Sequence, residues 1–225
     1  RVGKTTSTSR PDQRMFFMKD TKVGGNLDAS SETGYVHLDG GSVGGDATLA
    51  GNTRGDGNMG HIIIGYKGND KEVILSDKTA AQHSTSIGGV IKATAKRGHR
   101  SDRPELAKGD ILAYSDGNLV DKGGSAEDNL IADSGKNILI NRTSSGYTNT
   151  NTTVGKDLIL NAKGSNAIID VQVGNKSVIN SAEGYNSIDK LTTKELDTSA
   201  GYFTNLTNST ITGNAKARVG KTTST

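Results

Sequence analysis

The sequence predicts an all-β, elongated protein built from short strands, with little helix. Three observations predict this: short strands closed by turn residues, a small apolar content and internal repetition. Leu, Ile, Val and Phe account for 45 of the 225 residues, one fifth of the chain. That share is at the lower limit for a chain that must offset its conformational entropy by burying its own core. Ordered chains with so few apolar side chains share a core between stacked repeats or between neighbouring chains.

Short strands bounded by turn residues recur along the chain. Each has five to seven residues rich in Ile, Val, Leu or Tyr, and Gly, Asn, Asp or Ser follows nearly every one. These closing residues accept the positive φ or side-chain-capped conformations of tight turns. Strands of this length with this punctuation are typical of all-β architectures. The clearest are Ile62–Tyr66, Glu72–Ser76, Gly89–Ala95, Asp110–Ser115 and Asn137–Thr143.

The sequence repeats itself on two length scales. The octapeptide RVGKTTST occupies Arg1–Thr8 and again Arg218–Thr225, an offset of 218 − 1 = 217 residues. Shorter echoes begin with Val-Gly and are followed by a short alternating strand. One pair starts at Val23 and Val43, and a second pair with nearly the same spacing starts at Val154 and Val173. Both scales predict a tandem arrangement of similar units.

Helical signals are weak. The best candidate is Ser187–Leu196, where three apolar residues form an incomplete helical stripe. Two threonines interrupt it, and β-branched side chains lose χ1 freedom on a helix. A second segment, Arg103–Asp110, has Pro104 at a plausible first helical position. We expect a turn at most in that second segment.

The C-terminal third has a distinctive style of sequence. From Leu191 it reads LTTKELDTSAGYFTNLTNSTITGNAKA, in which single apolar residues stand about five apart among Thr, Asn and Ser. This resembles the shaft segments of bacteriophage tail fibres, as do VGKDLILNAKG and VGGNLDA. In that family three chains wrap around one axis, and each short strand contributes one inward residue. The resemblance implies a triple-stranded β-helix or intertwined β-solenoid, with a shared axis faced by Leu191, Leu196, Phe203, Leu206 and Ile211.

The resemblance also implies a function and an organisation. We expect a homotrimeric, non-enzymatic tail-fibre shaft that spaces and presents a host-receptor-binding tip, located in the virion and extracellular. Its partners would be other fibre, tail or baseplate proteins, and a host surface glycan bound by a tip outside this sequence. The alternatives are the stalk of a bacterial trimeric adhesin and a tailspike-type polysaccharide depolymerase. The expected segments are a β-rich fibre segment (1–100), a β-rich segment with turns (101–150), an intertwined shaft (151–217) and the start of the next repeat (218–225).

Cofactor and metal sites are not expected. Gly-Lys-Thr at 220–222 matches the end of a P-loop, but Ala215 stands where that motif requires Gly. The chain has no Cys, which excludes disulfides and thiolate metal ligands. Arg54–Asp56 forms an RGD tripeptide that a Gly-rich loop explains. The four histidines are isolated, and the His-x-His pairs that bind metal in some fibre tips are absent: His37, His61, His83 and His99.

Nucleic-acid binding and membrane insertion are likewise not expected. The formal net charge is only +3, without a basic stripe interleaved with aromatic residues. The longest purely aliphatic runs are three residues, Ile62–Ile64 and Leu158–Leu160, far shorter than a membrane span.

Hydrolysis of glycans is the enzymatic alternative. It requires two carboxyl groups flanking a cleft that aromatic side chains usually line. The chain has no Trp and only 4% aromatic residues, which argues against such a cleft. The candidate carboxylates are Asp110, Asp116, Asp121, Glu127 and Asp128.

One concentrated hydrophobic cluster lies near the N-terminus. Within Arg10–Asp20 it consists of Met15, Phe16, Phe17 and Met18. We expect these side chains to plug the axis where one repeat meets the next. The alternative is a docking patch for a partner.

Overall fold

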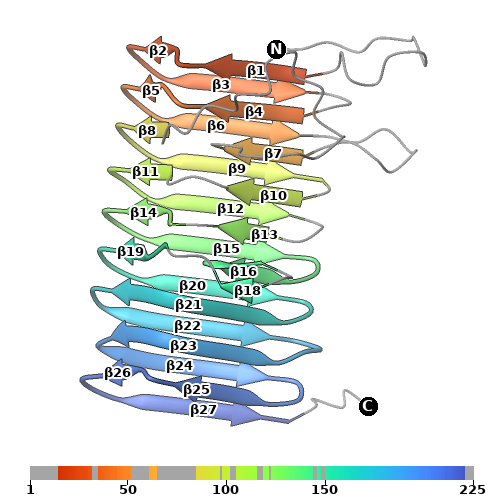
Figure 1. Ribbon diagram of the computed structural model, residues 1–225, viewed down its shortest axis with the longest axis vertical. Coiled ribbons are helices and arrows are strands. Elements are labelled where there is room, and N and C mark those ends of the chain that lie inside the picture. Colours follow the sequence, from red (N-terminus) through yellow and green to blue (C-terminus); the bar gives the residue numbers. More distant parts are fainter. Residues whose placement is uncertain are drawn as a thin grey trace, which may run out of the picture.

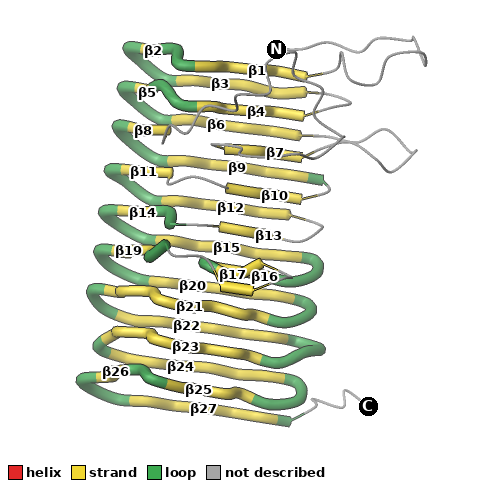
Figure 2. Tube along the Cα trace, viewed as in Figure 1, coloured by secondary structure: helices red, strands yellow, loops and turns green. Residues whose placement is uncertain are grey.

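The computed structural model is a β-solenoid, and the expected all-β class is confirmed. It describes residues 15–31, 35–51, 61–64, 85–96, 98–101, 105–115, 119–121, 123–143, 146–147 and 150–220, and this part of the chain contains no helix. Successive coils stack along the long axis from the N-terminal to the C-terminal end (Figure 1). Strands form the two broad sides, and turns join them at the two narrow ends (Figure 2).

One broad side is a sheet of nine parallel strands, which we call sheet A. Each coil contributes one strand to it, and chain order is also spatial order. Its strands are β3 (Leu27–Ser31), β6 (Ala47–Gly51), β9 (Ile91–Ala95), β12 (Ile111–Ser115), β15 (Leu130–Ser134), β20 (Leu158–Ala162), β22 (Lys176–Ser181), β24 (Glu195–Ala200) and β27 (Ala215–Val219).

The opposite side is a sixteen-stranded parallel sheet, sheet B, arranged in two columns that merge in two long strands. The first column comprises β1 (Met15–Lys19), β4 (Tyr35–Asp39), β7 (His61–Ile64), β10 (Gly98–Ser101), β13 (Leu119–Asp121), β16 (Ile138–Ile140), β21 (Asn166–Val173), β23 (Asn186–Thr193) and β25 (Thr204–Thr207). The second comprises β2 (Lys22–Val23), β5 (Ser42–Val43), β8 (Thr85–Ile87), β11 (Glu105–Ala107), β14 (Ser125–Ala126), β19 (Thr152–Val154), the ends of β21 and β23, and β26 (Thr210–Ile211). A separate antiparallel hairpin joins β17 (Arg142–Thr143) to β18 (Gly146–Tyr147).

The coil explains the short sequence echoes. Val23 pairs with Val43, and Val154 pairs with Val173, each one coil further along the stack. The spacing of the echoes is therefore the length of one uninterrupted coil. Insertions lengthen some coils without changing the register. Leu130, for example, pairs with Leu158 although the two lie 158 − 130 = 28 positions apart in sequence.

Side chains alternate between core and surface along each strand, as the two-residue period of a strand requires. In β9 and β12 the first, third and fifth residues are buried. The core is therefore built from columns of stacked residues, one from each coil. One column of sheet A illustrates this: Ala29, Leu49, Ala93, Ala113, Ala132, Leu160 and Ile179 are each at most 2% exposed.

Residues with positive φ bend sheet B between its two columns. Asp170, Lys190 and Asn208 have φ of 54°, 54° and 49°, and the flanking register places them above one another. At the first coil Asp20 has φ of 46°. Asn and Asp tolerate this left-handed conformation better than most residues. The bend therefore recurs at one place in the coil.

Asn and Asp also form a ladder at the turns that precede several of the sheet A strands. The Asp46 backbone N–H donates to Asn26 Oδ1 (3.0 Å), and the Val90 N–H donates to Asp46 Oδ1 (2.9 Å). Asn129 N donates to Asp110 Oδ1 (2.9 Å), and Asp157 N to Asn129 Oδ1 (3.1 Å). Each of these Asn and Asp side chains thus fixes the turn of the next coil. Val90, Lys176 and Glu195 occupy the same position in three other coils, so the ladder is not continuous.

The weak helix candidate Ser187–Leu196 lies in strands β23 and β24, because alternate residues there face one core, and the expectation of little helix is confirmed. One sequence prediction is wrong. The shared-axis prediction fails for Leu191 and Leu196, which are 0% and 4% exposed inside their own chain. Their apolar faces are buried by neighbouring coils, and no second chain is needed for that. Within Arg103–Asp110, β11 (Glu105–Ala107) is also a strand.

The other three residues expected to face a shared axis, Phe203, Leu206 and Ile211, lie at the C-terminal end of the stack. Phe203 and Leu206 are 51% and 39% exposed, and Ile211 is partly buried. The Phe203 ring stacks on that of Tyr185, with ring centroids 4.9 Å apart and an interplanar angle of 1°.

We expect Phe203→Ala to lower the free energy of unfolding by only about 0.5–1.5 kcal/mol, the usual contribution of an aromatic pair. A buried axial Phe would cost several times more per chain. Chemical denaturation of the variant measures the difference, with Tyr202→Ala, which removes another exposed ring, as the matched control. A loss above about 3 kcal/mol would show that Phe203 is buried in the assembled protein.

Candidate functional site

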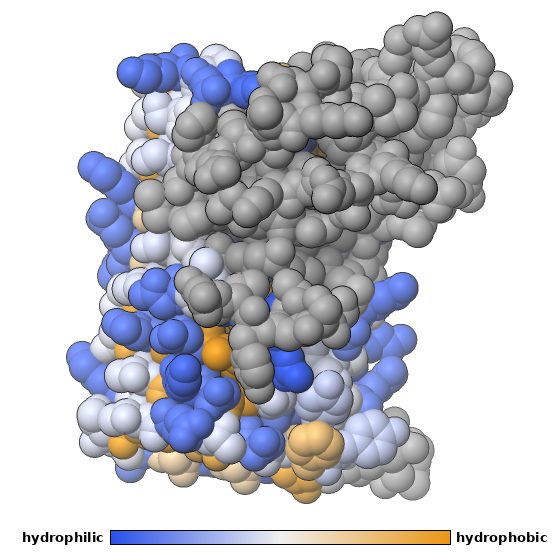
Figure 3. All heavy atoms as spheres, in the orientation of Figure 1, coloured by the Kyte–Doolittle hydropathy of each residue, from blue (hydrophilic) through white to orange (hydrophobic). Residues whose placement is uncertain are grey.

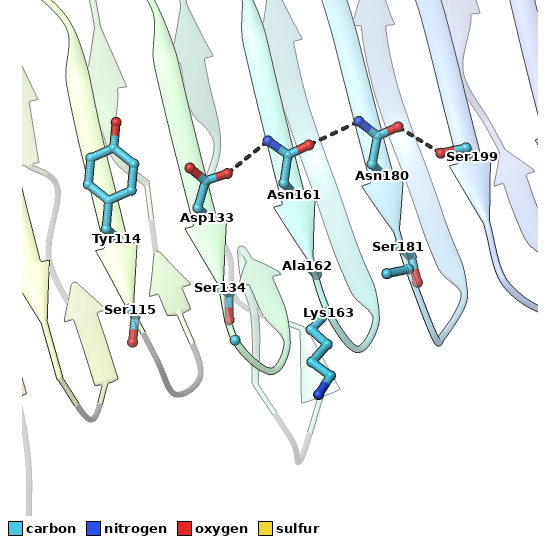
Figure 4. Close-up of a pocket in the computed structure, with 12 residues that line it drawn as sticks. Tyr114, Ser115, Asp133, Ser134, Asn161, Ala162, Lys163, Asn180, Ser181 and Ser199 are labelled. Atoms are coloured by element: carbon cyan, nitrogen blue, oxygen red, sulfur yellow. Dashed lines mark hydrogen bonds between the residues drawn. The ribbon is translucent and has the colours of Figure 1, made fainter. Parts of the chain in front are cut away.

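A hollow of about 620 Å³ lies on the outer face of sheet A, beside the turns that lead back to sheet B. Figure 4 shows a row of polar side chains along it, one from each of five successive coils. The row runs through Tyr114, Asp133, Asn161, Asn180 and Ser199, which are register partners in turn.

Hydrogen bonds join four members of this row. Asn161 Nδ2 donates to Asp133 Oδ1 (2.8 Å), and Asn180 Nδ2 donates to Asn161 Oδ1 (2.9 Å). The Ser199 hydroxyl donates to Asn180 Oδ1 (2.8 Å). Each amide therefore donates to one coil and accepts from the next. These bonds use part of the row's hydrogen-bonding capacity to hold adjacent coils in register.

The chemistry available in the hollow is that of a polar surface. Among the described residues, its lining has one carboxylate, Asp133, one ammonium group, Lys163, and one aromatic ring, Tyr114. Glycoside hydrolysis needs a second carboxylate across the bond to be broken. No second carboxylate lies among the described lining residues, and the hydrogen bonds of the row join adjacent coils.

The proposed catalytic carboxylates have structural partners. Asp110 Oδ1 accepts from the backbone N–H and the side-chain amide of Asn129, both at 2.9 Å. Asp128 pairs with Lys156 at 2.6 Å, and this pair raises the pKa of the Lys156 ammonium. Glu127 is exposed at the same turn. Asp116 lies outside the described residues.

Asp121 belongs to a buried polar cluster that sequence analysis did not find. It is 2% exposed, and its carboxylate accepts from Gly124 N (3.2 Å) and the Thr152 hydroxyl (3.3 Å). Asn141, which is fully buried, donates to Ile169 O at 2.9 Å and accepts from Gly123 N at 2.8 Å. This cluster closes the coil from which the β17–β18 hairpin emerges.

An apolar row lies on the outer face of sheet A next to the polar row. It consists of four register partners from successive coils, all partly buried: Leu112, Ile131, Ile159 and Val178. Lys92 precedes the row in the same column and Asp197 follows it. A contiguous apolar row on a strand face is unlike the isolated apolar residues that any surface carries.

The N-terminal hydrophobic cluster lies in β1, in the first coil. Met18 is 5% exposed, Phe16 is partly buried, and Phe17 is 37% exposed. The Phe17 ring contacts that of His37 edge-on, with centroids 5.1 Å apart. Part of the cluster thus belongs to the core of the solenoid, and its role at a junction between repeats stays a prediction.

Other sequence candidates lie beyond the described residues. They are the RGD tripeptide Arg54–Asp56, the strand Glu72–Ser76, His83, the first octapeptide and residues 221–225 of the second. Across the described ranges, no group of three or more His, Asp or Glu is positioned to hold a metal ion. No helix in that part of the chain is long and apolar enough to cross a membrane.

The last two coils are linked by a charged contact. Asn208 Nδ2 donates to Asp189 Oδ1 at 2.9 Å and holds the pKa of that carboxyl below its usual value, with help from the Thr207 hydroxyl. A carboxyl group whose pKa is lower in the folded state stabilises the protein at pH values above its unfolded-state pKa. That contribution is lost as the pH falls through the folded-state value.

We expect Asn208→Gly to raise the pKa of Asp189 toward its usual value, because the amide donor is lost. Glycine accepts the positive φ at this position, so the bend is kept. A carboxyl-carbon NMR titration measures the change. An unaltered titration would mean that the amide does not set this pKa.

No protein-family model matches this chain, and neither a curated protein nor a solved structure does.

Proposed function

We propose that this chain is a structural shaft segment of an extracellular fibre, of the kind found in bacteriophage tail fibres, which its sequence resembles. The observation that carries this proposal is the continuous stacking of sheet A through nine strands without a change of register. Such a stack advances about 4.8 Å per coil and has a fixed cross-section. It serves as a rigid spacer between an attachment point and a binding tip.

We further propose that the shaft is a homotrimer held together through the outer face of sheet A. The apolar row on this face supports lateral contact, because Ile131, Ile159 and their neighbours would lose water-exposed area there. Charged residues flank the row in its own column and would limit the contact to these four coils. Three copies around one axis would also present a tip trivalently, which raises its effective concentration at a surface.

The mass in solution tests this proposal. At low protein concentration, light scattering after size exclusion is expected to give about 70 kDa, three times the 23.4 kDa of one chain. At the same low concentration Ile159→Lys is expected to yield monomers, because it introduces a charge into the apolar row. Thr48→Lys, on an exposed residue of the same column, is the matched control and is expected to stay trimeric. A wild-type monomer, or trimers of both variants, would refute the sheet A trimer.

A further inference from the structure

The last coil presents an edge in which core columns end without a further strand among the described residues. Strand β27 pairs with β24 on one side only, and β25 and β26 pair only with β23. Core-column residues are exposed there: Leu206 is 39% and Val219 is 54% exposed. Figure 3 shows apolar atoms gathered at this lower end of the molecule. This C-terminal edge comprises β25, β26 and β27.

The backbone of this edge has a defined hydrogen-bonding pattern. At the start of sheet A strands, the first N–H donates to the carbonyl of the turn residue in the next coil. Examples are Leu27 N to Asp46 O at 2.8 Å and Leu196 N to Asn214 O at 3.0 Å. Ala215 occupies the same position in the last coil. Because alternate residues of a strand point their N–H groups to the same side, Ala215 and Ala217 direct theirs to the edge.

The first coil has the residues that complete these columns. The column of Leu27 is the one that ends at Ala215, and the column of Ala29 ends at Ala217. In sheet B the column of Met18 ends at Leu206, and that of Val23 ends at Ile211. Phe16, Val23 and Leu27 are only partly buried at this N-terminal edge of β1, β2 and β3. These four columns therefore continue with an apolar residue, whereas Phe16 would follow Thr204 and Ser31 would follow Val219.

The bends and turns of the two edges also match. Asp20 and Asn208 both have left-handed φ, of 46° and 49°, at the bend of sheet B. Asn26 and Asn214 both occupy the turn position of the Asn/Asp ladder, directly before a sheet A strand. Asn214 could thus accept from the Asn26 N–H as Asn26 accepts from Asp46 N.

Opposite charges on the two edges also favour this contact. On the outer face of sheet A, the column that starts at Asp28 ends at Lys216. Stacking the two edges would place these opposite charges on neighbouring strands, where a cross-strand pair is favourable. A similar contact already links the last two coils, since Arg218 Nη2 lies 2.8 Å from Asp197 Oδ1.

We propose that the C-terminal edge binds the N-terminal edge of a second copy of this chain, so that both sheets continue in register from one copy to the next. The contact is head-to-tail, and such a contact without closure produces a linear filament. The two copies of RVGKTTST predict that similar units follow one another, and a match between the two edges agrees with that prediction. The inference follows from the solenoid and does not depend on the proposed trimer.

Concentration-dependent assembly tests the proposal. Sedimentation velocity of the full chain is expected to show growth with concentration, and electron microscopy is expected to show rods. Nine coils advance about 43 Å, so rod lengths should be multiples of that distance. Particles of a single fixed mass up to the solubility limit would overturn the proposal, whether that mass is a monomer or a trimer.

Charge reversal identifies the surfaces. Lys216→Asp and Asp28→Lys should each weaken assembly by roughly 3–10-fold, because like charges would then meet. A mixture of the two variants, or one chain carrying both, should recover it. Lys92→Asp, in the same column of an interior coil, should have no effect. Equal assembly of Lys216→Asp and Lys92→Asp, or no recovery in the mixture, would overturn the proposal.

Ala217→Pro provides an independent test of the edge-to-edge contact. It removes an N–H that faces the edge, at a site where an edge strand tolerates proline. We expect the folded variant, checked by circular dichroism, to lose end-to-end growth while retaining lateral trimers. Ile159→Lys should instead lose lateral trimers while retaining end-to-end growth. The trimer proposal and the end-to-end proposal can therefore be refuted independently.

Discussion

We expect Leu49→Ala to lower the free energy of unfolding by about 2–5 kcal/mol, toward the upper end of that range. Leu49 is 1% exposed and its column neighbours are Ala29 and Ala93. Those methyl groups are too short to fill the space that Leu49 leaves, so the cavity remains open and its cost is not relieved. Denaturant unfolding measures the loss.

Thr48→Ala is the matched control for that substitution. Thr48 directly precedes Leu49 within β6 and points to the surface. Its replacement by Ala should change the free energy of unfolding by no more than about 0.5 kcal/mol. Because each coil contacts mainly its neighbours, faster hydrogen exchange in Leu49→Ala should centre on β3, β6 and β9. Equal effects of the two substitutions would mean that the columns of sheet A are not packed as the solenoid has them.

Asn141→Ala is the second substitution with a large expected effect. It should lower the free energy of unfolding by roughly 3 kcal/mol or more. The side chain donates to Thr152 Oγ1 (3.2 Å) and to Ile169 O (2.9 Å) in a fully buried setting. Alanine would leave these acceptors, and the Gly123 N–H, without their present partner. It would also have to adopt a φ of 55°, which disfavours residues with a Cβ and no local hydrogen bond.

Asn208→Ala separates these two contributions. Asn208 has a similar φ of 49° but is exposed, so its replacement should show the backbone cost, about 1–2 kcal/mol, together with the loss of one exposed hydrogen bond to Asp189. Thermal or denaturant melts of both variants give the comparison. Equal losses at the two positions would show that the buried network at Asn141 contributes little stability.

The strands and their spacing could be predicted from sequence because both depend on local signals. Turn residues and two-residue alternation placed β7, β9, β12 and β16 within or next to the predicted runs. The Val-Gly echoes identified one stacked position in four of the coils. The longer offset between Leu130 and Leu158 obscured the period, since an insertion separates two strands that pair in the same register.

The closed core could not be predicted in the same way. A count of Leu, Ile, Val and Phe omits the alanines, yet Ala29, Ala93 and Ala132 are buried core residues. Two closely spaced sheets need small side chains, and stacked Asn side chains such as Asn166 and Asn186 are also buried between them. The count of large apolar residues therefore underestimated what one chain can bury, and it favoured a core shared between chains.

The polar row on sheet A also went unrecognised, although Asn161 and Asn180 share the sequence offset of the second pair of echoes. Asp121 was among the candidate carboxylates, but its burial gave no sequence signal, because one of its partners, Thr152, is 31 positions away and comes from another coil. Contacts between coils depend on the stacking register, and no local pattern shows which residues will meet.

The parallel ladders have a mechanical consequence, because their hydrogen bonds run along the stacking axis from coil to coil. A pulling force along that axis would load the bonds of one inter-coil contact directly and would load all contacts in series. Sheets pulled along their strands instead share the load across many bonds in shear. Under axial tension this solenoid is therefore expected to open at its weakest contact and then to lengthen by one coil at a time.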